Sequence, residues 1–268
     1  MRSWLLSVLL VGCGRVGFDP LGGAPGDADA RDGGGPDPCA ASIDLDTLAL
    51  YTFEAGLGDD ATGAHDAMVR GGVTANAGFC GTTAGQFTTG GYLLVPDAPA
   101  FDVAAASLEL FLRSPAPGSV LNQTVIARDA IDVTFEGHFT LFLTPGGELI
   151  ARHQRAGASF FRCAAPIAAD TWTHIGVSIG GTAAQGFRLW VDHAEAALAS
   201  AFVNGVTVDC LGASPPGGLA GNDNTWVIGG TNALAAEGVT DPSTEQFLID
   251  GAIDQVHLRS VWRDFGAP

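Results

Sequence analysis

One pentapeptide in the sequence matches a catalytic motif. Residues Gly176–Gly180 read Gly-Val-Ser-Ile-Gly, the G-x-S-x-G spacing of a nucleophile elbow, which places a serine on a sharp turn from a strand into a helix. Here Ser178 lies within a run of alternating apolar and polar residues, and Gly-Gly-Thr follows. We therefore interpret Ser178 as a strand residue rather than a nucleophile. The sequence also has no H-E-x-x-H, EF-hand or P-loop pattern.

The five cysteines are the next reactive side chains. Each stands alone without a C-x-x-C pair, which argues against a zinc site. The N-terminal residues indicate that the chain is exported and that Cys13 carries a lipid. The other four cysteines are then an even number in an oxidising compartment, which predicts two disulfides. Sequence alone leaves three pairings open. We favour the two local ones, Cys39 with Cys80 and Cys163 with Cys210.

The N-terminal residues indicate export. Arg2 precedes an apolar run from Leu5 to Val11 that is too short to span a bilayer. The run ends in Leu-Val-Gly-Cys, which resembles the lipobox of bacterial lipoproteins, where the cysteine becomes the first mature residue and carries diacylglycerol. The resemblance implies a signal peptide over residues 1–12 and a lipid on Cys13, with a soluble secreted protein as the alternative. Lipoproteins kept at the inner membrane usually have Asp after this cysteine, so Gly14 favours an outer-membrane location in the cell envelope.

Composition describes the rest of the chain. Residues 13–38 are rich in Gly, Asp and Pro and poor in core-forming residues, which predicts a flexible tether. Residues 39–268 then form one domain. The 47% hydrophobic content of the whole chain excludes global disorder. The 12 basic residues, all arginine, oppose 29 acids for a net charge of -17, so we expect no nucleic-acid partner and membrane contact through the lipid only.

Short apolar or alternating runs recur between Gly, Pro, Asp and Asn clusters, as in a β-sandwich or barrel. The clearest alternation is at Thr173–Ile179 and Phe187–Val191, with a turn over 180–186 between them. Ala194–Phe202 has no apolar face of helical period, so we predict strand and loop there. Four further strands are predicted at Leu48–Phe53, Gly91–Val95, Leu108–Leu112 and Phe139–Leu143.

Several of these runs together resemble the LamG-like (laminin G-type, concanavalin A-like) domains. The matching blocks, in order, are Leu50–Gly56 with Asp60–Ala67, Gly91–Asp102, Thr171–Val177, Phe187–Asp192, and Val227–Gly230 with Phe247–Val256. The resemblance implies an all-β fold, a two-sheet antiparallel jelly-roll sandwich. One departure is His193, which stands where the family usually has Gly after Asp, and this puts the type of that turn in doubt.

This fold carries sugar-binding modules, adhesion domains and some glycoside hydrolases, so function depends on the site. The familiar hydrolase arrangement on it is Glu-x-Asp-x-x-Glu along one strand, and none of the glutamates begins that pattern. We therefore expect a non-catalytic binding module for a glycan or a surface protein. The alternatives are a scaffold module of an envelope assembly without a sugar ligand and a diverged hydrolase.

Three acids are candidate calcium ligands by resemblance. Many LamG-like domains hold a structural Ca²⁺ near the first strand and the last, and Glu54, Asp60 and Asp254 occupy those positions. Calcium takes six to eight oxygen ligands, including backbone carbonyls. The alternative is that Asp60 caps a turn and Asp254 meets Arg259 or backbone amides.

Candidate sugar-binding residues are an outward-alternating pair, Arg188 and Trp190, and the loop-adjacent Trp226. Exposed rings beside polar groups stack on pyranose faces while hydrogen bonds orient the sugar. The alternative is that these rings are covered by other parts of the fold. By the same resemblance, Trp172 and Trp262 are expected in the core.

Overall fold

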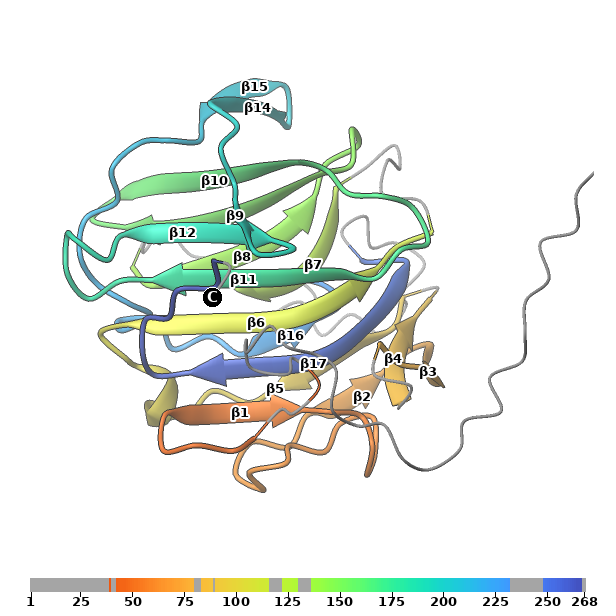
Figure 1. Ribbon diagram of the computed structural model, residues 1–268. Helices are drawn as coiled ribbons and strands as arrows, with labels where there is room; N and C mark the ends of the chain where they lie inside the picture. The colour runs from red at the N-terminus through yellow and green to blue at the C-terminus, as the bar shows by residue number, and fades with distance from the viewer. Residues whose placement is uncertain are drawn as a thin grey trace, which may run out of the picture. The chain divides into compact units, whose positions relative to one another are not determined.

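The strands form two antiparallel sheets that face each other across a shared apolar core (Figure 1). The computed structural model describes residues 39, 42–79, 83–88, 90–115, 122–129, 136–231 and 248–266, all in one compact unit, Gly35–Pro268. The predicted signal peptide and nearly all of the tether precede this unit and lie outside the described residues. The architecture confirms the predicted all-β, two-sheet sandwich.

The first sheet has the strand order β13-β12-β11-β6-β17-β4-β3, with β1 paired to β17 as well. Its strands are β1 (Thr47–Tyr51), β3 (Val73–Ala77), β4 (Thr83–Phe87), β6 (Ala106–Arg113), β11 (Thr173–Ile179), β12 (Phe187–Val191), β13 (Ala194–Glu195) and β17 (Gly251–Arg259). Two of them, β11 and β12, have the bounds predicted from their alternation.

The second sheet has the order β10-β9-β8-β7-β16-β5-β2. Its strands are β2 (Met68–Arg70), β5 (Tyr92–Val95), β7 (Gln123–Arg128), β8 (His138–Leu143), β9 (Glu148–Arg155), β10 (Ala158–Pro166) and β16 (Trp226–Ile228). A 3-10 turn, η1 (Pro99–Phe101), and a separate hairpin of β14 (Ser200–Val203) and β15 (Val206–Asp209) complete the elements. The described part of the chain contains no helix with the length and apolar character needed to cross a membrane.

Alternation decides which side chains enter the core. On β11, Ile175 and Val177 point toward the second sheet, while His174, Gly176 and Ser178 lie on the outer face of the first sheet. Ser178 therefore lies within a strand, as predicted, and its Oγ donates to the carbonyl of Arg263. Each fully buried aliphatic side chain contributes about 1.5–3 kcal/mol, so this alternation fixes the strand register.

A bulge lets β17 pair with two strands on one side. The first half of β17 pairs with β4 and its second half with β1. Between them the register against β6 shifts at Asp254–His257, and Gln255 has a φ of 54°. The extra residue bends the strand, as β-bulges do. Asp254, a predicted calcium ligand, lies at this bulge.

The β14–β15 hairpin covers part of the outer face of the second sheet. Ala201 packs beside Phe142 and Ile150, and the disulfide between Cys163 of β10 and Cys210 after β15 belongs to the same cluster. This confirms the predicted Cys163–Cys210 pairing. Cys39 is also disulfide-bonded, whereas its predicted partner Cys80 lies outside the described residues, so that pairing stays a prediction.

The C-terminal segment, residues 260–266, crosses the outer face of the first sheet over β11 (Figure 1). Phe265 fills the space above Gly176, where an added Cβ would lie 2.4 Å from the Phe265 ring. The Phe265 and Trp190 rings are 5.6 Å apart at 68°. Arg263 pairs with Asp44 at 2.6 Å, which fastens this segment near the start of the domain.

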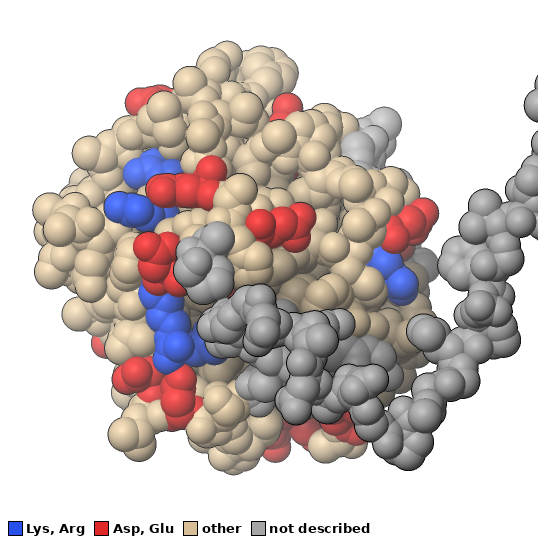
Figure 2. Space-filling view, in the orientation of Figure 1, with Lys and Arg blue, Asp and Glu red and all other residues tan. Residues whose placement is uncertain are grey.

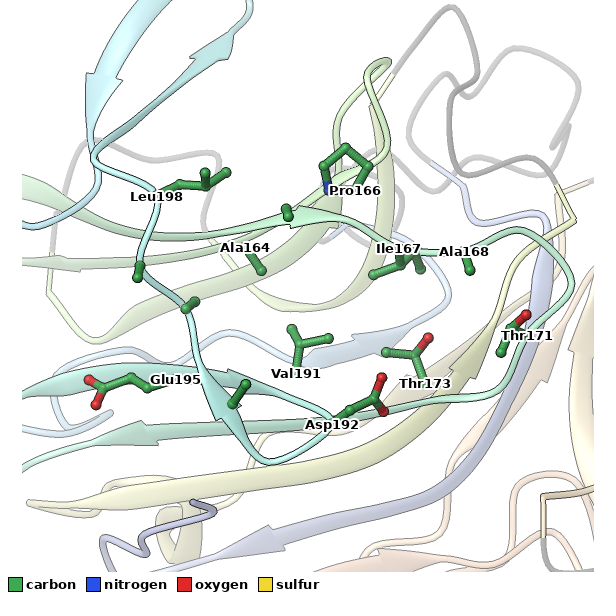
Figure 3. A pocket seen from close by; sticks show the side chains of 14 residues that line it. Ala164, Pro166, Ile167, Ala168, Thr171, Thr173, Val191, Asp192, Glu195 and Leu198 are labelled. Atoms are coloured by element: carbon green, nitrogen blue, oxygen red, sulfur yellow. The ribbon is translucent and has the colours of Figure 1, made fainter. Parts of the chain in front are cut away.

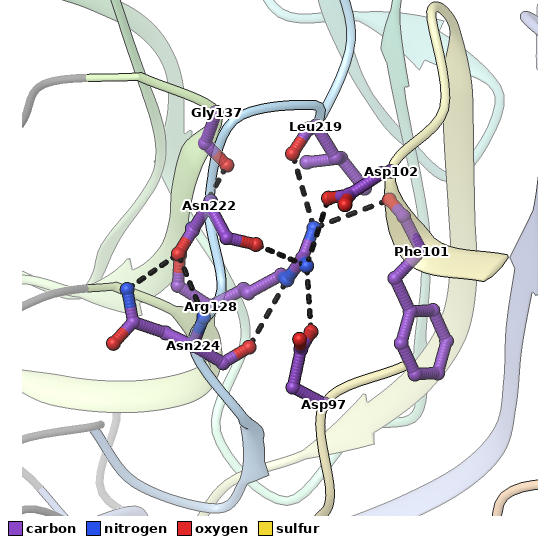
Figure 4. A network of polar contacts seen from close by, with 8 residues as sticks. All are labelled: Asp97, Phe101, Asp102, Arg128, Gly137, Leu219, Asn222 and Asn224. Atoms are coloured by element: carbon purple, nitrogen blue, oxygen red, sulfur yellow. Dashed lines mark hydrogen bonds and ion pairs between the residues drawn. The ribbon is translucent and has the colours of Figure 1, made fainter. Parts of the chain in front are cut away.

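A buried arginine joins the loops at one end of the sandwich (Figure 4). Arg128 has no exposed surface, and its guanidinium donates to the carbonyls of Phe101, Leu219, Asn222 and Asn224. It also pairs with Asp97 at 2.7 Å and Asp102 at 3.3 Å. A buried guanidinium is tolerated only when its donors are satisfied, so these loops are held by one shared partner.

Candidate ligand-binding site

A hollow of about 460 Å³ opens at one edge of the sandwich, where the two sheets separate (Figure 3). On the side of the second sheet it is lined by the end of β10 and the residues that follow, including Ile167. On the side of the first sheet it is lined by Val191, Asp192 and Glu195 at the β12–β13 hairpin. Its surface is mainly small or apolar, and the polar side chains lie on the side of the first sheet.

A second hollow of about 340 Å³ adjoins the first and shares Glu195 and Ala196 with it. Its lining is more polar and includes Arg162, Gln185 and Arg188. We refer to the two hollows together as the edge groove.

Hydrogen bonds hold the wall of the edge groove in place. Asp192 and His193 form the β12–β13 turn with φ of 49° and 66°, and Asp192 Oδ1 accepts the backbone N–H of His174 at 2.9 Å. Further along, the Leu198 N–H donates to the Cys163 carbonyl. Both central residues of the turn are left-handed, so His193 adopts the backbone conformation that favours Gly. The wall is therefore formed before any ligand arrives.

Glu195 interacts electrostatically with both arginines that line the groove, Arg162 and Arg188. Arg188 pairs with Glu195 at 3.4 Å, and both side chains are partly exposed, at 36% and 51%. The guanidinium of Arg188 lies 5.7 Å from the ring centroid of Trp262, and the Trp262 Nε1–H donates to the carbonyl of Gly186, another lining residue. Burial lowers the pKa of Arg162, whose guanidinium donates to backbone carbonyls. Charged, amide and apolar groups thus face one groove.

Of the three predicted sugar-binding residues, one lies in the edge groove and two are buried. Arg188 lines the edge groove, whereas Trp190 and Trp226 are only 2% and 1% exposed. Trp190 is covered by Trp262 and Phe265, and Trp226 packs inside the sandwich against Phe101 and Phe139. Neither ring presents a face to a ligand. Burial by distant parts of the chain removes both indoles from the candidate site.

Two other indoles differ from their predicted core positions. Trp172 and Trp262 are half-buried on the outer face of the first sheet. Trp172 follows Thr171, which lines the edge groove, and Trp262 contacts Arg188 of that groove. Their exposure results from strand alternation at Trp172 and from the path of the C-terminal segment at Trp262. The local sequence contained the alternation around Trp172, but it contained nothing that predicts the path of the C-terminal segment around Trp262.

Asp60 does not fit the predicted calcium site. Its carboxylate accepts the backbone N–H groups of Leu50, Thr62, Ala64 and His65, and the Thr62 hydroxyl as well. Burial alone would raise its pKa, but these hydrogen bonds outweigh burial and lower it. Asp60 is thus a loop-capping residue, which was the alternative interpretation. Within the described residues no group of three or more acids, histidines or cysteines is arranged to hold a metal.

Asp254 and Glu54 behave differently. Asp254 Oδ2 accepts the Phe79 N–H at 2.8 Å, but its buried Oδ1 has no hydrogen-bond partner, and neither does the buried Oε1 of Gln255. Burial, together with the charge of Glu54, raises the Asp254 pKa to about 6. Buried oxygens without partners are the kind of ligand that calcium takes, and of the three predicted acids only Asp254 has one, so calcium binding stays a prediction.

No protein-family model and no curated protein sequence matches this chain. Among solved structures, domain 4 of the extracellular GH43 arabinanase AbnA from Geobacillus stearothermophilus, in complex with arabinotriose, is similar over 80% of this chain and 92% of its own, with a TM-score of 0.54 and 14% identity. The botulinum neurotoxin serotype D binding domain is similar over 82% of this chain, with a TM-score of 0.54 and 10% identity. This chain covers 49% of that structure.

At these identities the likeness concerns the fold. It agrees with the sandwich that the LamG-like resemblance implies, while membership of that family stays a prediction. A binding domain of botulinum neurotoxin DC in complex with SialylT is also similar, with a TM-score of 0.54 and 10% identity.

Proposed function

We propose that the protein is a lipid-anchored carbohydrate-binding module of the cell envelope, which holds a saccharide in the edge groove without cleaving it. The observation that supports this most directly is the lining of the groove, where Arg188, Glu195 and Gln185 face an apolar wall beside the half-buried Trp262. Saccharides present hydroxyl groups and apolar ring faces together, and this lining offers partners for both. The arabinotriose bound to the similar arabinanase domain supports the same ligand class.

The absence of cleavage is part of the proposal. Glycoside hydrolysis needs one protonated carboxyl and one carboxylate on either side of the bond. In the edge groove Glu195 is paired with Arg188, and Asp192 accepts a backbone N–H. Asp254, a carboxyl whose pKa burial raises, is not among the lining residues. These features favour binding over acid catalysis.

A glycan array with the purified protein tests the ligand class. We expect saturable binding to at least one saccharide, and a roughly tenfold or greater loss of affinity in Glu195→Gln and in Arg188→Gln, because each removes a charge-assisted hydrogen bond. Arg70→Gln is the matched control, since Arg70 is an exposed arginine of β2 outside the groove. Binding that is unchanged in both groove variants, or no binding to any glycan, would contradict the proposal.

The lipid anchor is tested separately. If Cys13 carries the lipid, the wild-type protein partitions into the detergent phase and Cys13→Ala moves to the aqueous phase, since a diacyl group supplies most of the affinity for membrane. An unchanged partition of the variant would show that Cys13 is not the anchor. Fractionation of inner and outer membranes then tests the predicted outer-membrane location.

A scaffold role is the second candidate, and the β14–β15 hairpin favours it. Phe202 and Val206 of the hairpin and Leu211 just after it are 65%, 62% and 57% exposed, and exposed large apolar side chains that share one surface mark interaction sites. In this role the partner is an envelope or surface protein. A blank glycan array together with cross-links from this hairpin to one defined envelope protein would favour the scaffold over the sugar-binding module.

A further inference from the structure

A second exposed aromatic surface lies on the outer face of the first sheet, at the end of β11 that adjoins the edge groove. Phe79 is 38% exposed, and its ring is stacked on the buried ring of Phe111, with centroids 4.0 Å apart and an angle of 10°. Because Phe111 covers one face of Phe79, the exposed face is the opposite one. Trp172 stands edge-on to Phe79 at 6.4 Å. The two rings form a shallow platform.

The platform has a cation at its edge. The guanidinium of Arg113 lies 4.9 Å from the ring centroid of Trp172. None of the ion pairs or side-chain hydrogen bonds among the described residues involves Arg113. By contrast, Arg128, Arg259 and Arg263 all pair with carboxylates. Arg113 is half-buried, and the ring of Trp172 is the contact its guanidinium makes among the described residues.

The charges differ between the two sides of the platform. Asp254 lies beside Phe79, whose N–H its Oδ2 accepts at 2.8 Å, and burial raises the pKa of this carboxyl to about 6, whereas Arg113 lies beside Trp172. Glu109, two strand positions before Phe111 on the same face of β6, is already bound by Arg259 at 2.9 Å and by His174 at 2.9 Å. On the face shown in Figure 2, arginine and acidic side chains lie beside one another and form no continuous basic patch. Arg113 is therefore a single point of positive charge beside two aromatic rings, rather than part of a surface for polyanions.

We propose that Phe79, Trp172 and Arg113 form a binding site for an acidic sugar, with the apolar ring face of the sugar on the aromatic platform and its carboxylate on the guanidinium. Ring stacking supplies an apolar contribution, and a guanidinium matches the planar geometry of a carboxylate with two parallel hydrogen bonds. The inference rests on the proposed sugar-binding function and names its ligand class, a polysaccharide that contains uronic acid.

The platform lies next to the edge groove, because neighbouring residues of one segment contribute to both surfaces. Thr171 and Thr173 line the edge groove, and Trp172 between them, just before β11, instead contacts Phe79 and Arg113. One saccharide chain therefore has contacts available at both surfaces, neutral residues in the groove and an acidic residue on the platform.

The test compares oligogalacturonate with its methyl ester, which keeps the ring and loses the charge. We expect the wild-type protein to bind the acid about 10- to 100-fold more tightly than the ester, the range for a hydrogen bond to a charged group. Arg113→Gln should bind both equally, and Arg113→Lys should retain part of the preference because it keeps the charge but not the planar geometry. Arg70→Gln, which removes the same charge elsewhere, should retain the full preference.

The outcomes separate this inference from the proposed function. If Arg113→Gln keeps the preference for the acid, or the wild-type protein shows none, the platform is not an acidic-sugar site, even where the array shows glycan binding that is lost in Glu195→Gln. If no glycan binds at all, the proposed function fails first. A loss of affinity for both the acid and its methyl ester in Trp172→Ala, with an unchanged melting temperature, supports the platform independently of charge.

Discussion

The single residue with the clearest electrostatic cost is Asp254. Its folded pKa of about 6 lies above the ordinary value of 3.8, so the folded state disfavours the ionised carboxylate. Well below pH 4 the Asp254 carboxyl is protonated in both the folded and the unfolded state, so it costs no folding stability. As the pH rises to 6 and beyond, the unfolded chain ionises freely and the folded state bears a penalty of about 2–3 kcal/mol.

Asp254→Asn should remove that penalty. The variant keeps an acceptor for the Phe79 N–H, so we expect it to match the wild type at pH 4 and to be more stable by about 2–3 kcal/mol at pH 8 in calcium-free buffer. Urea unfolding measures the difference. If Glu54 and Asp254 hold calcium, adding millimolar Ca²⁺ raises the melting temperature of the wild type and leaves Asp254→Asn unchanged. A variant that is less stable than the wild type at both pH values would contradict the electrostatic explanation.

At the same scale, the sequence predicted the chemistry of residues better than their exposure. The alternation of β12 placed Arg188 and Trp190 on one outer face, which the structure confirms. It carried no information that Phe265, 75 residues later, covers Trp190 and leaves Arg188 in a groove. Arg113, Phe79 and Trp172 come together from three separate segments, so their contact is visible only in the fold.

At the scale of elements, local patterns predicted six of the strands, and longer strands such as β9 and β10 were not among them. Thr173–Ile179 and Phe187–Val191 were predicted to the residue because both alternate strictly and a Gly-containing turn, residues 180–186, separates them. Where alternation is weak, as in the three-residue β2, no strand was predicted. The bulge of β17 also went unpredicted, since no local signal in Asp254–Gln255 distinguishes it from regular strand.

The disulfide between Cys163 and Cys210 gives an element-scale prediction. It ties the β14–β15 hairpin to β10, with a sequence separation of 47 residues, and the loop-entropy model assigns such a crosslink about 4 kcal/mol. We expect Cys163→Ala/Cys210→Ala to lose up to that amount in urea unfolding. Because the Leu198 N–H bonds to the Cys163 carbonyl, the groove wall should loosen too, and hydrogen exchange over residues 194–199 should accelerate.

The control for this prediction is chemical reduction of both the wild type and the double variant. Reduction opens the Cys39 disulfide in both proteins but the Cys163–Cys210 disulfide in the wild type alone, so the two reduced proteins should have the same stability and the same exchange. Exchange that is faster only at β14 and β15, with residues 194–199 still protected, would mean that the disulfide holds the hairpin and not the groove.

At the scale of the whole molecule, buried titratable groups determine the dependence of stability on pH. Burial lowers the pKa values of His153 and His257 to about 4, so between pH 6.5 and 4 the unfolded chain gains protons at these residues and the folded state does not. Asp254 has the opposite effect, because between pH 6 and 3.8 its carboxyl binds a proton in the folded state but not in the unfolded chain. Burial of Glu109 is outweighed by its bonds to His174 and Arg259, which lower its pKa to about 2 and extend the loss of stability below pH 4.5.

The net balance below pH 6 is about one proton more on the unfolded chain, which corresponds to a loss of about 1.4 kcal/mol per pH unit as the pH falls. Urea unfolding between pH 4 and 7.5 measures this slope. His153→Gln keeps a donor for the Gly218 carbonyl but does not titrate, so the slope between pH 6 and 4 should nearly vanish. Asp254→Asn should instead double the slope, because it removes the opposing proton. If both variants show the wild-type slope, the acid sensitivity arises from the overall charge of the chain and not from these buried groups.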